Sequence, residues 1–272
     1  MSRTPLLQAH FDASYGRHQV LKGVNLELYA GETLGLVGTS GAGKSTVVLA
    51  LLGLLPWRGG KVVGEVLLEG RDLLRMKESE VRRLRGRRVA LVPQSPTTAL
   101  NGAISLRVHF EEAWRAHEHS GRGALQNRLA SLLPQVQLPS DAEFLRRKSN
   151  QISVGQAQRI MIALALLHRP ALLIADEPTS ALDPLTQAEL LKLLKELNCS
   201  TNTAMLYISH DLISVLQLCH RLAVLDAGTI VETLDVNALE EQARNPTTIA
   251  LLNALPVPPS LLLGRGQTPG SL

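Results

Sequence analysis

The residues best suited to chemistry lie in the glycine-rich stretch 35–47. There Gly38, Gly43, Lys44 and Ser45 fit the pattern G-x-x-x-x-G-K-[ST]. Glycines let the backbone curl so that successive N–H groups point at one anion, and the start of a following helix adds positive charge. In this pattern the lysine reaches the terminal phosphates and the serine hydroxyl is placed to ligate Mg²⁺. We interpret the stretch as a phosphate-binding loop; the alternative is a glycine-rich turn that binds nothing.

Two acidic residues, Asp176 and Glu177, end the apolar run 171–177. Apolar runs of this kind are typical of a central parallel strand. Asp176 is suited to hold Mg²⁺ through water, and Glu177 to polarise an attacking water as a general base. The alternative is a strand that simply ends in exposed acids. A phosphate-binding loop in the same chain favours the catalytic interpretation.

Three more side chains stand at the ends of predicted strands. Gln94 follows the strand 89–92 and could reach a metal or a water beside the phosphates. His210 follows the strand 205–209 and is a candidate for contact with a γ-phosphate. Tyr15 could stack on an adenine ring, or be an ordinary strand aromatic. Ser209, His210 and Asp211 do not form a catalytic triad, because adjacent residues on a strand end cannot adopt that geometry.

These side chains need rigid elements to hold them, and the hydrophobic patterns predict most of those elements. The predicted strands cover 7–11, 24–29, 32–37, 62–70, 89–92, 171–177 and 205–209, with a hairpin at 222–233. The predicted helices cover 46–55, 152–167 and 188–197, and Ser153 is the expected N-cap of the second. Residues 104–150 are mostly helical, punctuated by Pro134 and Pro139. We therefore expect a helical subdomain, at about 104–167, inserted into an α/β core.

The whole chain has 272 residues, an apolar fraction of 45% and a formal charge of +4. We expect a single domain over 1–255 and a frayed Pro- and Gly-rich tail over 256–272, with no signal peptide. The longest near-apolar run, 47–57, is too short to span a bilayer, so any membrane role would be peripheral. Cys199 and Cys219 form no disulfide framework, which suits a reducing cytosol.

Two clusters suggest other functions. Five arginines gather within 82–88, but no aromatic residues interleave with them to stack bases, so we favour a solvated helix face over a nucleic-acid patch. Three histidines lie among glutamates, but their spacing gives no compact i, i+4 pair, so a metal site is disfavoured. The residues concerned are Arg82, Arg83, Arg85, Arg87 and Arg88, and His109, Glu111, Glu112, His117, Glu118 and His119.

Taken together, these motifs resemble the ATP-binding cassette of ABC transporters over about residues 5–255, in the order in which the family carries them. Leu172–Asp176 is similar to Walker B, Glu177 to the catalytic glutamate, Gln94 to the Q-loop glutamine, 180–183 to the D-loop, and His210 to the switch histidine. Tyr15 is similar to the aromatic that stacks on adenine. The Walker A loop corresponds to Gly38, Thr39, Ser40, Gly41, Ala42, Gly43, Lys44, Ser45 and Thr46, and the signature to Ile152, Ser153, Val154, Gly155 and Gln156.

The resemblance implies a P-loop α/β fold with a mixed or parallel core sheet, an N-terminal antiparallel β subdomain and the inserted helical subdomain. It implies ATP and Mg²⁺ as cofactors, with Ser45, Gln94 and Asp176 on the metal. In this family ATP lies between the Walker face of one cassette and the signature of another. The signature here has Val154 where the family has glycine, and a degenerate signature suggests a heterodimer with one stronger and one weaker site.

The stretch 94–101 and the Arg-Gly segment at 85–89 are similar to those of the peptide and nickel importer cassettes. This implies an ATPase subunit of an importer for peptides, nickel or a metal chelate, at the cytoplasmic face of the inner membrane. Its expected partners are two permease chains, a second cassette and, indirectly, an external binding protein, but no nucleic acid. The alternatives are a non-transport cassette ATPase and a weakly active regulatory cassette. No cysteine follows Cys219, so no iron–sulfur cluster is implied.

Overall fold

A computed structural model describes residues 4–118 and 120–263. The chain divides into two compact units. One comprises Met1–Met76 and Ala204–Leu272, and we call it the loop unit because it contains the glycine-rich loop. The other comprises Lys77–Thr203, and we call it the helical unit. His119 and residues 264–272 of the predicted tail lie outside the described residues.

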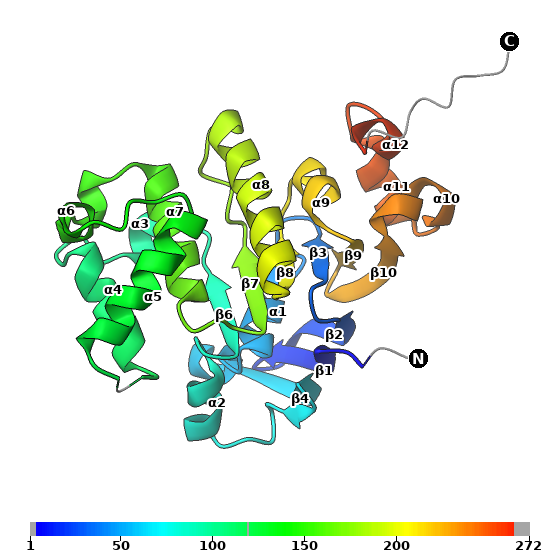
Figure 1. Cartoon of the computed structure of the whole chain (residues 1–272). Helices are drawn as coiled ribbons and strands as arrows, with labels where there is room; N and C mark the ends of the chain where they lie inside the picture. Colours follow the sequence, from blue (N-terminus) through cyan, green and yellow to red (C-terminus); the bar gives the residue numbers. More distant parts are fainter. Residues whose placement is uncertain (1–3, 119, 264–272) are drawn as a thin grey trace, which may run out of the picture. The chain divides into compact units, whose positions relative to one another are not determined.

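The first sheet of the loop unit is antiparallel, with strand order β2-β1-β4-β5 (Figure 1). Its strands are β1 (Leu7–Tyr15), β2 (His18–Leu28), β4 (Gly60–Leu68) and β5 (Arg71–Asp72). Buried and exposed residues alternate along β1, and Leu7 and Phe11 are almost fully buried. This alternation is expected of a sheet with one face on the core. The predicted N-terminal antiparallel strands are confirmed.

The second set of strands in the loop unit is mixed. β3 (Thr33–Val37) lies between β8 (Ala204–Ile208) and β9 (Arg221–Asp226) and is parallel to both. β10 (Thr229–Asp235) pairs with β9 as the predicted antiparallel hairpin. Every residue of β3 and β8 is buried, as continuous apolar runs in parallel strands require.

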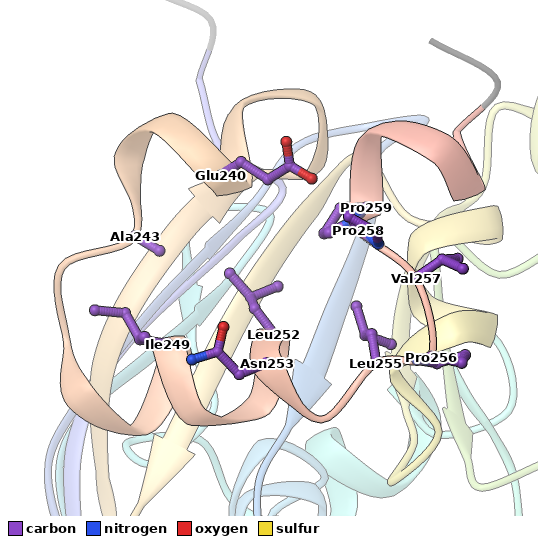
Figure 2. Close-up of a pocket in the computed structure, with 10 residues that line it drawn as sticks. All are labelled: Glu240, Ala243, Ile249, Leu252, Asn253, Leu255, Pro256, Val257, Pro258 and Pro259. Carbon is purple, nitrogen blue, oxygen red and sulfur yellow. The ribbon is translucent and has the colours of Figure 1, made fainter. Parts of the chain in front are cut away.

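The helices of the loop unit follow these strands. α1 (Lys44–Leu51) begins two residues earlier and ends four residues earlier than predicted. The helix is ended by Gly53, which has φ +64°: the N–H of Gly53 donates to Ala50 O at 3.0 Å and that of Leu54 to Leu49 O at 2.7 Å. The 3₁₀ helix η1 (Leu55–Arg58) follows. The remaining helices are α9 (Leu212–Leu218), η3 (Val236–Ala238), α10 (Leu239–Gln242), α11 (Pro246–Asn253) and α12 (Pro259–Leu262). α10, α11 and α12 surround a cavity of about 750 Å³ that Ile249, Leu252 and Pro258 help to line (Figure 2).

The helical unit holds two parallel strands, β6 (Val89–Val92) and β7 (Leu172–Asp176). Its helices are α2 (Glu78–Leu84), α3 (Pro96–Ala99), α4 (Leu106–Arg115), α5 (Arg122–Gln135), α6 (Ala142–Arg146), η2 (Ser149–Gln151), α7 (Val154–Leu166) and α8 (Pro184–Thr201). α7 packs against α3, α4, α5 and β6 (Figure 1). The predicted α/β class is confirmed.

α8 starts four residues before the predicted position, because Asp183 caps its N-terminus and Pro184 occupies its first turn. Pro134 lies one residue before the end of α5, so the helical region is interrupted close to the predicted position. Among the described residues, no helix combines the length and the apolar character needed to cross a membrane.

Candidate functional site

The glycine-rich loop connects β3 to α1 in the loop unit, which is the predicted strand–loop–helix arrangement. Gly43 is the N-cap of α1, and no side chain caps the helix by hydrogen bonding. The first turn contains no acidic residue. The N–H groups of a first helical turn lack intrahelical partners, so this helix start is suited to bind an anion.

Two positions in the loop require glycine. A Cβ on Gly38 would lie 2.3 Å from the carbonyl oxygen of Leu225 in β9. Gly43 has φ +107°, and a Cβ there would lie 2.7 Å from a methyl group of Leu21 in β2. The loop is therefore pressed against β9 on one side and against β2 on the other.

Lys44 is held over the same loop. Its Nζ donates to the carbonyl oxygens of Gly38 at 2.8 Å and Thr39 at 3.1 Å. Ser45 is exposed and follows directly in the first turn of α1, while Thr46 is buried. The loop thus combines an ammonium, a hydroxyl and unpaired helix N–H groups.

His210 leaves the sheet at the same edge as the loop. β3 and β8 are parallel neighbours, and Leu36 pairs with Ile208. Gly38 lies two residues after Leu36, and His210 lies two residues after Ile208. Both therefore lie at the carboxyl edge of these strands, where ligands bind in open α/β sheets. His210 is exposed.

The neighbours of His210 have structural roles. Ser209 Oγ accepts a hydrogen bond from the N–H of Asp211 at 3.0 Å. The carboxylate of Asp211 accepts from the N–H of Ile213 at 3.0 Å and caps α9. Ser209 and Asp211 therefore shape the turn that carries His210.

Tyr15 ends β1 in the loop unit, half-buried, and pairs with His18 on β2 and Gly60 on β4. A Cβ on Gly60 would lie 3.1 Å from its ring. The ring therefore lies beside Gly60, and α1 packs against both β1 and β2.

In the helical unit, the structure brings together two predicted residues that are 83 positions apart. Gln94 Nε2 donates to Glu177 Oε2 at 2.8 Å. β6 and β7 are parallel, with Val92 opposite Ala175. Gln94 and Glu177 each lie two residues beyond this pair, at the same edge of the two strands. Glu177 has φ +46°, a left-handed conformation that is uncommon for a residue with a Cβ. Asp176 is the last residue of β7 and is half-buried.

The predicted signature residues form the start of α7. Ser153 is the N-cap, as predicted from sequence, and its Oγ accepts from the N–H of Gln156 at 3.1 Å. Gln156 Oε1 accepts in return from the N–H of Ser153, which completes a capping box. Val154 is the first helical residue, is 44% exposed and is absent from the positive-φ residues of the described chain. Its Cβ therefore causes no backbone strain.

A cavity of about 590 Å³ adjoins this helix start, and the α8 N-terminus forms its other wall. Asp183 accepts from the N–H groups of Leu185 and Thr186 and, at 2.6 Å, from Thr186 Oγ1. The side-chain hydrogen bond from Thr186, followed by the backbone ones, keeps the pKa of Asp183 below its ordinary value. A Cβ on Gly155 would lie 3.0 Å from the Thr186 methyl group, so the two helix starts are in close contact.

Sequence reasoning missed Arg159, which is 8% exposed on α7. Its guanidinium donates to Glu189 Oε2 on α8 at 3.0 Å and to the side chain of Gln137. The arginine therefore ties the signature helix to α8. The signal was present, because a buried arginine on an otherwise apolar helix face requires a partner.

The helical unit also contains the arginine and histidine clusters that were considered as a nucleic-acid patch and a metal site. Arg82 and Arg83 are exposed on α2, while Arg85 forms a two-pronged ion pair with Glu78. His109 Nε2 accepts from the N–H of Asn101, and the ring of His117 meets that of His168 edge-on. No cluster of three metal-ligating side chains occurs within residues 4–118 and 120–263.

Comparison with known proteins places these features in context. The family described as "ABC transporter" matches residues 21–180. The chain is 39% identical to the dipeptide transport ATP-binding protein DppD of Escherichia coli (strain K12), covering 92% of this chain and 76% of that protein. It is 38% identical to the oligopeptide transport ATP-binding protein OppD of Bacillus subtilis (strain 168), with coverages of 92% and 70%. A solved dimeric ATP-binding cassette bound to ADP and Pi superposes with a TM-score of 0.72 at 25% identity, covering 85% of this chain and 98% of that one.

Proposed function

Because this chain belongs to the ABC transporter family and is one of its ATPase subunits, we propose that it powers the import of peptides through a membrane permease. The names of DppD and OppD support peptides over nickel or a metal chelate within the sequence prediction. ATP is its substrate, and ATP hydrolysis is its chemical reaction.

The hydrogen bond between Gln94 and Glu177 carries the catalytic assignment. The amide holds one carboxylate oxygen of Glu177 and so orients the carboxylate that accepts a proton from water. A carboxylate fixed in this way acts as the general base that activates the attacking water. Gln94, two residues beyond β6, is the positioning residue for that base.

In the loop unit, Lys44 and the first-turn N–H groups of α1 bind the phosphates of ATP, and His210 contacts the γ-phosphate. Tyr15 stacks on the adenine. Ser45, Gln94 and Asp176 offer a hydroxyl, an amide and a carboxylate oxygen, which are the hard ligands that suit Mg²⁺. When bound, Mg²⁺ neutralises charge on the phosphates. The chain's own groups orient the nucleotide and take up the proton.

The signature residues contact the nucleotide bound to a second cassette, and that second cassette is a different chain. These residues are Ser153, Gly155 and Gln156. Two permease chains and an external binding protein complete the importer, and the chain is peripheral at the cytoplasmic face of the inner membrane. The dimeric cassette with ADP and Pi supports the two-cassette arrangement.

The test is Glu177→Gln in the complex with its permease chains, reconstituted in liposomes. ATP binding should be retained and ATP turnover should stop, together with ATP-driven peptide uptake. Glu196→Gln, an exposed change on α8 with the same loss of charge, is the matched control and should behave as the unmodified chain. Normal turnover in the Glu177→Gln complex would show that another group is the base. Turnover without peptide uptake in the unmodified complex would refute the cargo and leave the chemistry standing.

A further inference from the structure

The helical unit contains a second cavity, of about 610 Å³, whose lining is strongly basic. The described residues that line it include four arginines and one acidic residue, Glu118, and these give it a formal charge of +3 when His168 is neutral. Its walls come from the ends of α4 and α7, one face of α5 and the segment before β6. The lining arginines are Arg87, Arg88, Arg128 and Arg169. We call this cavity the arginine cavity.

We propose that the arginine cavity binds a small phosphate-bearing anion of the diphosphate class. A monosubstituted diphosphate carries roughly three negative charges near neutral pH, about two on its terminal phosphate and about one on the inner phosphate. This matches the charge of the cavity. The planar guanidinium group binds phosphate oxygens through two parallel N–H donors, which is why arginine is preferred at phosphate sites.

The cavity has a rigid cationic wall. The half-buried guanidinium of Arg128 donates through Nε to Leu167 O at 2.8 Å and through Nη2 to Leu166 O at 2.6 Å. A guanidinium has five N–H donors, so these two bonds fix its plane and leave others for a ligand. Burial, and then the positive charge of Arg169, lower the pKa of Arg128.

No carboxylate forms an ion pair with Arg87, Arg128 or Arg169 among the described residues. The guanidinium groups of the cavity therefore repel one another, and a bound anion would relieve this repulsion. The neighbouring His117 experiences the same field: burial, and then the charges of His168 and Arg87, lower its pKa.

The cavity also has an aromatic wall. Trp114 stacks on His168 with ring centroids 5.3 Å apart, and both line the cavity. His168 Nε2 contacts Ala113 O at 3.0 Å, which fixes the ring.

Trp114 supplies the readout. The chain has two tryptophans, and Trp57 is 71% exposed in η1 of the other unit, so Trp57→Phe leaves Trp114 as the single reporter. Inorganic pyrophosphate is titrated at constant ionic strength in a Lys44→Ala background, which weakens phosphate binding at the glycine-rich loop without adding a second diphosphate, and Trp114 emission is followed. We expect a saturable change that weakens as salt is raised, because screening reduces attraction between charges.

Two pairs of substitutions separate a site from general basic charge. Arg87→Gln with Arg169→Gln removes two exposed arginines of the cavity, and the affinity for pyrophosphate should fall about tenfold or more, equivalent to about 1.4 kcal/mol. Arg82→Gln with Arg83→Gln removes the same charge from the exposed face of α2 and should leave the affinity unchanged. Arg87→Gln alone serves if the first pair fails to fold.

An emission change that never saturates would overturn the proposal. Equal affinities of the two paired variants for pyrophosphate would also overturn it, because an equal loss would show that only net charge matters and no loss would show that the cavity is not the binding site. The test is independent of peptide transport and of hydrolysis, so failure here leaves the proposed function intact.

Discussion

Substituting alanine for Gly38 would test how tightly the phosphate loop is built. The added Cβ would lie 2.3 Å from Leu225 O and 3.3 Å from the Cβ of Ala42. An ordinary van der Waals contact of a Cβ is at least 3.4 Å, so the loop or β9 must move by about 1 Å. Overpacking of a tight site costs about 1–3 kcal/mol, and Leu225 O is backbone that cannot rotate away. We therefore expect the free energy of unfolding to fall by about 1–3 kcal/mol.

The same displacement should weaken ATP binding, because it moves the N–H groups that face the phosphates. Equilibrium denaturation and nucleotide titration measure the two effects separately. Gly102→Ala is the matched control, since its Cβ would meet only Ser149 Oγ, at an ordinary 3.6 Å. Neutral substitutions change the free energy of unfolding by up to about 0.5 kcal/mol. If Gly38→Ala changes it by no more than this and binds ATP as well as the parent, the close approach to β9 does not control the loop.

Three further predictions concern the start of α7 and its neighbours. Val154→Gly should lower stability by only about 0.3–0.5 kcal/mol through helix propensity while raising ATP turnover of the two-cassette complex; unchanged turnover would show that the valine is tolerated there. Arg159→Met should destabilise the chain by about 1–2 kcal/mol in denaturant, since the buried end of the Glu189 pair is lost, and an effect within 0.5 kcal/mol would argue against that role. The pKa of Asp183 is lowered, so its hydrogen bonds stabilise the fold above the ordinary pKa of 3.8 and are lost as pH falls through the folded value. The melting-temperature gap between the parent and Thr186→Val should therefore close in acid, and a gap that persists at the lowest accessible pH would contradict this reasoning.

Local motifs were predictable from the sequence because their physics is local. The loop at 38–46 needs only its own glycines, lysine and serine, next to an apolar strand and a helix start. Ser153 was predicted as a cap because a serine before an apolar helical pattern accepts from the first-turn N–H groups. The β9–β10 hairpin followed from Asp226-Ala227-Gly228 between two apolar runs.

Helix lengths were less predictable, since they depend on which residues later find a place in the core. α8 extends well beyond the amphipathic segment 188–197, because Asp183 and Thr186 form a cap that periodicity alone does not reveal. α1 is shorter than its apolar run because Gly53 adopts a left-handed conformation that ends the helix. In both places a specific residue outweighed the hydrophobic pattern.

The sequence by itself determined the family, the phosphate loop and the identity of the candidate base, because each depends on residue types at fixed short spacing. Only the tertiary structure decided that Gln94 holds Glu177, that Arg159 ties α7 to α8, and that arginines from distant segments line one cavity. The physical reason is that parallel strand register and helix packing set these contacts. Both arise between segments tens of residues apart, and no local pattern in the chain encodes their geometry.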